Sequence, residues 1–210
     1  IPNTAALDAT VVRNTTATRI NSAGLIVVEA ANVARISYTL NTGGEGFILD
    51  EPQRTNLAFP SNNKNNISSG DTQGTYLANT STLTPDNSLT SYRFTPTQVG
   101  QSLAGGSGAS GNRIYFQISA ANTTYTNSVF VKSASGSSFN LAIKVLNINS
   151  DDQISTFTIV VNNTWKRVDV AGLVTSTVGT GIRFAIKSEQ AVDLWGFGVE
   201  AGATVTSYIP

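Results

Sequence analysis

Two chemically versatile residue types are absent from this sequence. None of its 210 residues is a cysteine or a histidine. Without cysteine the chain has no disulfide bond, no thiolate nucleophile and no cysteine-based metal site. Without histidine it lacks the commonest metal ligand, the usual general base and any Ser-His-Asp triad. We therefore expect a non-enzymatic protein with no cofactor and no metal site.

Charge is also scarce. Only 12% of the residues are charged, about half the ~25% of an ordinary soluble protein. Thirteen basic residues balance thirteen acidic ones, which argues against electrostatic binding to nucleic acid or to an anionic membrane. No apolar run approaches the ~18 residues of a membrane span. We expect no nucleic-acid partner and no membrane insertion. Because the chain starts at Ile1 rather than Met, we also expect a part of a longer protein or a processed product.

Alternation of apolar and polar residues dominates the second half of the chain. Apolar residues occupy every second position in Phe139–Val145, and Gly181–Lys187 repeats the pattern. Such alternation is typical of strands with one buried face. The strands are separated by turns rich in Gly, Ser and Asn, and no helical period competes with them. The sequence therefore predicts an all-β, antiparallel β-sandwich, and we favour a jelly roll because about eight strands are present.

The N-terminal residues differ from this pattern. Two short β-prone runs flank a turn signal at Asn21–Gly24 and suggest a hairpin. The hairpin has too few apolar residues for a core of its own, so it should lie against the main domain or a partner. We expect residues 1–45 to form an arm that serves as a docking segment and residues 46–210 to form the sandwich.

Gly46–Leu57 marks the boundary, and we expect it to be the first strand of the sandwich. Glu51 and Arg54 are predicted to fix this strand beside the last strand of the domain, near Glu200. The two ends of the domain would then close together. Leu49 and Leu57 are expected to be buried in this arrangement, and Trp195, which lies among apolar neighbours, is expected in the core.

Five residues are candidates for ligand binding: Trp165, Arg167, Asp169, Phe130 and Lys132. The first three share one parity of a predicted strand, opposite to two valines that should face the core. A sugar would stack on an exposed aromatic ring and bond to charged or amide groups. In the alternative, which is the more common outcome for such residues, Trp165 covers a sheet edge and the charges are solvated or paired. The scattered acids include no convincing pair for glycoside hydrolysis.

Several motifs resemble bacteriophage virion proteins. The sequences Glu-Pro-Gln-Arg-Thr-Asn-Leu, ending at Leu57, and Glu-Ala-Gly with Thr-Ser-Tyr-Ile-Pro, ending at Pro210, form the most specific pair. Further matching stretches are Ala17–Ile26, Ala34–Tyr38, Tyr125–Lys132 and Thr164–Val168. The similar proteins are of the tail-fibre, tailspike and head-fibre types, and they carry a jelly roll like that of carbohydrate-binding modules.

The resemblance implies a structural protein on the surface of the virion. It also implies other virion proteins as partners, a homo-oligomer with a trimer favoured, and host-surface glycan as a candidate ligand. The main hypothesis is therefore a fibre, spike or tail component whose jelly roll contributes to host attachment. A capsid-decorating or adaptor protein with a purely architectural role is the first alternative. A carbohydrate-binding module of a secreted enzyme is the second.

Overall fold

The computed structural model describes residues 11–13, 15–49, 51–52, 54–57, 74–96, 113–118, 124–147, 153–174, 182–188 and 190–209. Its elements are all strands: β1 Ala17–Ile20, β2 Ile26–Glu29, β3 Ile36–Thr39, β4 Gly43–Ile48, β5 Gly74–Asn79, β6 Ser91–Pro96, β7 Arg113–Ile118, β8 Thr124–Ser133, β9 Phe139–Asn147, β10 Gln153–Val161, β11 Lys166–Val174, β12 Ile182–Lys187 and β13 Val192–Ala201. Within these ranges no helix has the length and apolar character of a membrane span.

Two antiparallel sheets form the main domain. One has the strand order β11-β8-β13-β6-β5 and the other the order β10-β9-β12-β7. From β6 to β13 the chain supplies eight strands. The first, eighth, third and sixth of them are neighbours in one sheet, and the second, seventh, fourth and fifth are neighbours in the other. This order is that of a jelly roll, with β5 added at the edge beside β6. The predicted all-β, antiparallel sandwich is confirmed.

The core lies between the two sheets. Val129 and Leu194 enter it from the five-stranded sheet, and Leu141, Ile143 and Ile186 enter it from the four-stranded sheet. Each of these residues is fully or almost fully buried. They occupy alternate positions of their strands, so the other parity of each strand belongs to the outer side of its sheet.

The N-terminal unit, residues 11–13 and 15–49, consists of two hairpins. β1 pairs with β2, and β3 pairs with β4. The turn before β2 requires Gly24, which has a φ of +75°, because a Cβ there would meet the backbone carbonyl carbon of Asn41 at 2.5 Å. The expected hairpin around Asn21–Gly24 is therefore present, and a second hairpin follows it.

The expected first strand of the sandwich is not found at Gly46–Leu57. The expected boundary between residues 45 and 46 falls inside β4, whose strand partner is β3 of the N-terminal unit. Gly43 and Gly44 adopt positive φ and allow the chain to turn back on itself there, so the apolar residues that follow pair with β3. Leu57, expected to be buried, is 55% exposed, and Leu49 is only half-buried.

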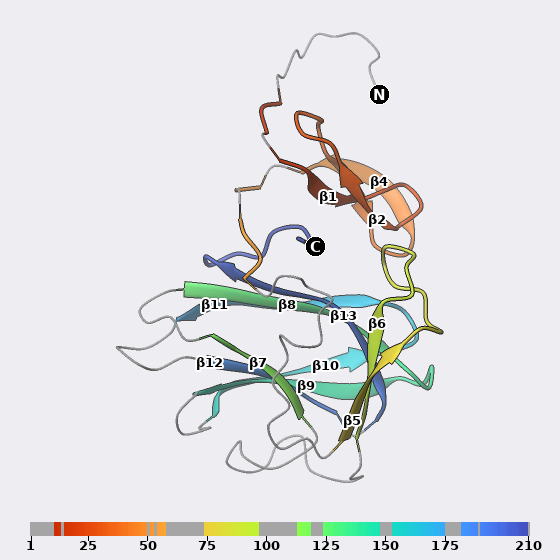
Figure 1. Ribbon diagram of the computed structural model, residues 1–210, viewed down its shortest axis with the longest axis vertical. Coiled ribbons are helices and arrows are strands. Elements are labelled where there is room, and N and C mark those ends of the chain that lie inside the picture. Colours follow the sequence, from red (N-terminus) through yellow and green to blue (C-terminus); the bar gives the residue numbers. More distant parts are fainter. Residues whose placement is uncertain are drawn as a thin grey trace.

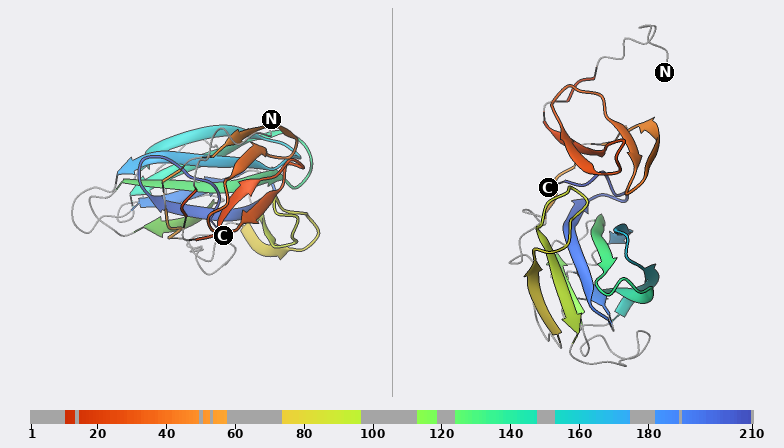
Figure 2. Two further views of the ribbon diagram at one scale, coloured as in Figure 1. Left: turned by 90° about the horizontal axis from the view of Figure 1, so that it is seen from above. Right: turned by 90° about the vertical axis from the view of Figure 1, so that its right-hand side faces the viewer.

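The N-terminal unit lies over the outer side of the five-stranded sheet (Figures 1 and 2). The tail, residues 202–209, turns back from β13 and runs between this sheet and the unit, as the position of the C-terminus in both figures shows. Residues 54–57 run along β13, where the backbone N–H of Leu57 donates to the carbonyl of Val199 at 2.7 Å. Segments from both ends of the described chain thus meet on one sheet.

Candidate functional site

The predicted ligand-binding residues do share one face, the outer side of the five-stranded sheet. The register sets Arg167 opposite Phe130 and Asp169 opposite Ser128, on the neighbouring strands β11 and β8. Phe130 in turn pairs with Trp195 on β13. The alternation in the sequence therefore predicted which of these residues share one side of the sheet, but it did not show what lies over that side.

The aromatic residues of this face are buried, which corrects the expectation of an exposed platform. Trp165 is 6% exposed and lies just before β11, and its indole N–H donates to the carbonyl of Leu83 at 2.7 Å. Phe130 is 2% exposed. Neither ring offers a free face to a sugar. The physical reason is that Ile26 of the N-terminal unit joins both rings in one buried cluster.

Tyr208 of the tail completes this cluster. Its ring centroid lies 4.5 Å from that of Trp195 and 5.9 Å from that of Phe130, and the two latter rings meet edge to face at 5.3 Å. Trp195, expected in the core, is 1% exposed, and its indole N–H donates to the Thr90 hydroxyl at 3.1 Å. Aromatic contacts of this kind contribute about 0.5–1.5 kcal/mol each beyond the burial of their area.

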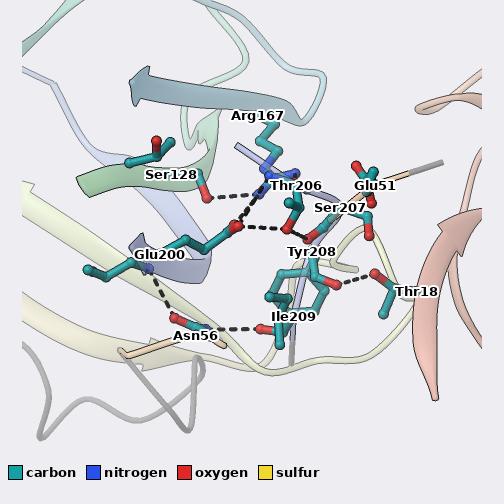
Figure 3. A network of polar contacts seen from close by, with 12 residues as sticks. Thr18, Glu51, Asn56, Ser128, Arg167, Glu200, Thr206, Ser207, Tyr208 and Ile209 are labelled. Atoms are coloured by element: carbon teal, nitrogen blue, oxygen red, sulfur yellow. Dashed lines mark hydrogen bonds and ion pairs between the residues drawn. The ribbon is translucent and has the colours of Figure 1, made fainter. Parts of the chain in front are cut away.

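Arg167 lies beside the cluster and ties the sheet to the tail (Figure 3). Its guanidinium stands over the Phe130 ring at 5.6 Å and donates to the carbonyl of Thr206 at 2.5 Å and to the Ser128 hydroxyl at 3.0 Å. Burial lowers the pKa of the Arg167 guanidinium from its ordinary value, and the nearby carboxylates of Glu200 and Asp169 oppose that change. The guanidinium remains charged.

Glu200 is the acidic partner in this network. Its carboxylate is buried, lies 3.9 Å from the Arg167 guanidinium and accepts hydrogen bonds from the hydroxyl and the backbone N–H of Thr206, at 2.6 and 3.3 Å. Glu200 therefore holds the first turn of the tail rather than Gly46–Leu57. A buried carboxylate is stable when it is both paired and hydrogen-bonded.

Arg54 and Glu51, which were both expected near Glu200, form hydrogen bonds with different parts of the chain. Arg54 donates to the carbonyl of Ala201, the residue after Glu200. Glu51 instead accepts a hydrogen bond from Arg35 at 3.0 Å, within the N-terminal side of the molecule. The segment around Arg54 thus lies beside the end of β13, whereas Glu51 pairs with Arg35 of the N-terminal unit.

Asn56 makes the bonds that hold this segment. Its amide N–H₂ donates to the carbonyls of Phe197 and Ile209 at 3.0 and 2.9 Å, and its carbonyl accepts from the backbone N–H of Val199 at 3.0 Å (Figure 3). One side chain therefore links residues 54–57, β13 and the tail. Sequence reasoning assigned no role to Asn56, although it belongs to the Thr-Asn-Leu motif of the boundary stretch.

The N-terminal unit is attached by further polar contacts. Thr18 donates to the carbonyl of Tyr208, and Arg35 donates to the Ser207 hydroxyl at 2.9 Å. Asn41 donates to the carbonyl of Trp165 at 2.8 Å. Together with the aromatic cluster, Arg167, Glu200 and Asn56, these contacts form what we call the junction. These contacts join residues that are far apart in the sequence, so the junction holds segments of the chain together.

Asp169 is the exposed member of the predicted set, and Lys132, like Arg167, is half-buried. In the strand register Lys132 stands opposite Asp193, and Asp169 stands opposite Ser128. Ser128 and Lys132 are four positions apart along β8. The structure therefore separates them by roughly 13 Å along the strand. Among the described residues no group of three or more acidic side chains is placed to hold a metal ion.

The outer side of the four-stranded sheet has a different character. The register aligns Arg113 with Lys187, Tyr115 with Ala185 and Lys144, and Gln117 with Arg183. These positions have the parity opposite to that of the buried Ile143 and Ile186, so they belong to the outer side. On the same side Asn140 and Thr158 are exposed. Four of these aligned positions are basic and none is acidic.

The geometry defines a class of protein: an all-β chain in which a jelly roll carries a small two-hairpin unit on one of its sheets. No protein-family model and no curated protein matches this chain. Among solved structures it is similar to a CBM4 structure, with a TM-score of 0.43, 11% identity and coverage of 53% of this chain and 71% of the other.

Two further structures have comparable similarity. The C-terminal family 22 carbohydrate-binding module of Clostridium thermocellum Xyn10B has a TM-score of 0.45 and 11% identity, over 75% of this chain and 96% of that one. The enzymatically active domain of tailspike protein 4 from bacteriophage CBA120 has a TM-score of 0.42 and 11% identity, over 67% of this chain. The match spans only 20% of the tailspike chain.

Proposed function

We propose that the protein is a non-enzymatic structural protein of a phage virion that contributes to host attachment by binding surface glycan. The observation that supports the glycan part is the difference between the two outer sheet sides. The five-stranded sheet carries the N-terminal unit and the tail, so it has no room for a ligand on the predicted aromatic residues.

The proposal therefore assigns recognition to the outer side of the four-stranded sheet. Tyr115 supplies an aromatic position, and Arg113, Lys144, Arg183 and Lys187 supply cationic positions in the neighbouring rows. Aromatic rings stack on sugars, and cationic side chains bond to hydroxyl and carboxylate groups. Because these rows contain no acidic residue, the ligand class that fits is an anionic polysaccharide.

The virion part rests on the sequence motifs described above. In this proposal the protein lies on the surface of the particle, contacts other virion proteins and forms a homo-oligomer, with a trimer favoured. A carbohydrate-binding module of a secreted enzyme would bind glycan in the same way. Detection of the protein in purified particles would distinguish the two locations.

Titration calorimetry against a panel of neutral and anionic bacterial surface polysaccharides tests the glycan part. We expect binding to anionic members, and a loss of about tenfold or more in affinity when Tyr115 or Arg183 is replaced by alanine. Asp169→Ala, an exposed change on the opposite sheet, is the matched control and should bind like the wild type. Absence of binding across the panel, or equal losses in all three variants, would contradict the proposal.

A further inference from the structure

A cleft between the N-terminal unit and the tail has no role in the proposed function. Its volume is about 700 Å³, within the range of ligand sites in proteins. The lining comes from the segment before β1, from β1 and β2, from the residues before β3, from the end of β4 and the residues after it, and from Thr206 to Ile209 of the tail. Tyr208 belongs both to this lining and to the aromatic cluster, so the cleft adjoins the cluster.

Apolar side chains form much of the rim of this cleft. Val12, Val28 and Ile48 are 80%, 63% and 81% exposed, and all three line it. Six of the twelve large apolar side chains that are exposed in the described part of the chain belong to the N-terminal unit. Such a concentration on one small unit is typical of a surface that another molecule covers.

Within the described part of the chain, two arginines at the cleft have no acidic partner. Arg13 donates to the carbonyls of Thr15, Glu29 and Ala30, and Arg54 donates to the carbonyl of Ala201. None of the ion pairs among the described residues includes either of them. Arg35, also in the lining, is neutralised by Glu51 at 3.0 Å. The lining therefore carries two positive charges that an anionic partner would compensate.

One strand at the cleft has an edge without a strand neighbour among the described residues. β4 belongs to a two-stranded sheet and has β3 as its single strand partner there, whereas the other edge of β2 is partly occupied, because the backbone N–H of Ile26 donates to the carbonyl of Pro85 at 2.8 Å. Val28 of β2 and Ile48 of β4 are the residues of these strands that line the cleft. A free strand edge presents backbone donors and acceptors to which an extended polypeptide can add.

We propose that this cleft binds an extended segment of a partner protein in which apolar residues alternate with carboxylates. The apolar residues would cover the rim, and the carboxylates would pair with Arg13 and Arg54. A second copy of this chain that used the same surface would bring the same arginines together, and such like-charge contacts are unfavourable. The charges of the cleft therefore favour an acidic partner over self-association.

The experiment uses the full chain and a fluorescent peptide of alternating valine and glutamate, with a matched peptide of alternating valine and lysine. Fluorescence anisotropy should show at least about tenfold tighter binding of the acidic peptide. The difference should shrink as salt is raised, because exposed charges are screened. Equal affinities for the two peptides, or no binding of either, would overturn the proposal.

Paired variants test the location. Ile48→Ser and Arg13→Gln should each weaken the binding of the acidic peptide by about fivefold or more. Their controls are Leu77→Ser and Lys166→Gln, which change an exposed apolar and an exposed cationic residue on the jelly roll. Unchanged thermal midpoints would establish that the cleft variants are folded. If one of them is not folded, Val12→Ser is measured in its place.

Sedimentation measurements on the same proteins examine self-association. If the wild type is an oligomer that Ile48→Ser dissociates, and the acidic peptide does not bind, the occupant of the cleft is a second copy and the proposal is wrong. If the acidic peptide binds and Ile48→Ser weakens it without changing the oligomeric state, the proposal is supported. Neither outcome depends on whether the jelly roll binds glycan.

Discussion

Replacement of Asn56 by alanine should lower the free energy of unfolding by about 3 kcal/mol. Asn56 is buried and makes three hydrogen bonds, with the carbonyls of Phe197 and Ile209 and with the backbone N–H of Val199, all between 2.9 and 3.0 Å. A typical hydrogen bond contributes about 1 kcal/mol net, and a buried group left without a partner costs about 1–3 kcal/mol. Alanine removes all three of these bonds.

Urea denaturation followed by tryptophan fluorescence measures this change. Trp165 and Trp195, the two tryptophans of the chain, both lie in the junction, so the signal reports the region that Asn56 supports. Asn163→Ala, at an exposed position, is the control and should change the free energy of unfolding by less than about 0.5 kcal/mol. A loss below about 1 kcal/mol for Asn56→Ala would refute the role assigned to its three bonds.

Two further predictions concern the core and the junction. Burial, with a smaller contribution from Tyr92, raises the pKa of Tyr76 well above its ordinary value, and its hydroxyl has no hydrogen-bond partner. Tyr76→Phe should therefore stabilise the protein by about 1 kcal/mol at pH 7. Because the fold favours the neutral phenol, the wild type should lose stability above about pH 10, and the variant should lose less. Urea denaturation of the wild type and of Tyr76→Phe at pH 7 and 10.5 measures both effects. A variant less stable than the wild type at pH 7 would contradict the predicted stabilisation. Gly196 has a φ of +61°, and a Cβ there would meet Tyr208 at 2.9 Å and Phe130 at 3.1 Å, whereas Gly136 has a φ of +80° with its nearest neighbour at 3.8 Å. Gly136→Ala should thus cost about 1 kcal/mol for the backbone alone and Gly196→Ala about 3 kcal/mol. Equal costs in thermal unfolding would show that the aromatic cluster does not restrict Gly196.

The fold class could be predicted because strand alternation is a local property. Phe139–Val145 and Gly181–Lys187 carry the period of two that a half-buried strand imposes, and residues 139–145 and 182–187 lie in β9 and β12. The number of strands then favoured a jelly roll. Parity also placed Arg167 and Asp169 on one side of their strand, and the register of β11 and β8 sets them opposite Phe130 and Ser128 on the outer side of the five-stranded sheet.

The burial of that outer side could not be predicted from parity. Trp165 is covered because Ile26 and Tyr208 pack in the same cluster, and these residues are far from it in the sequence. The same limit applies to Gly46–Leu57. Its apolar triplet fits a sandwich strand and a hairpin strand equally well, and only the turn at Gly43 and Gly44 directs it to β3. Residues whose parity directs them to the outer side of a sheet can thus be buried by another segment of the same chain.

The hydrogen bond from Thr18 to the carbonyl of Tyr208 joins residues that are 190 positions apart in the sequence. Tension applied between β1 and the tail would therefore pass through the junction alone, without crossing either sheet of the jelly roll. The tail itself lies between the five-stranded sheet and the N-terminal unit (Figure 2). The sheets of the jelly roll therefore lie outside the path by which force passes between β1 and the tail.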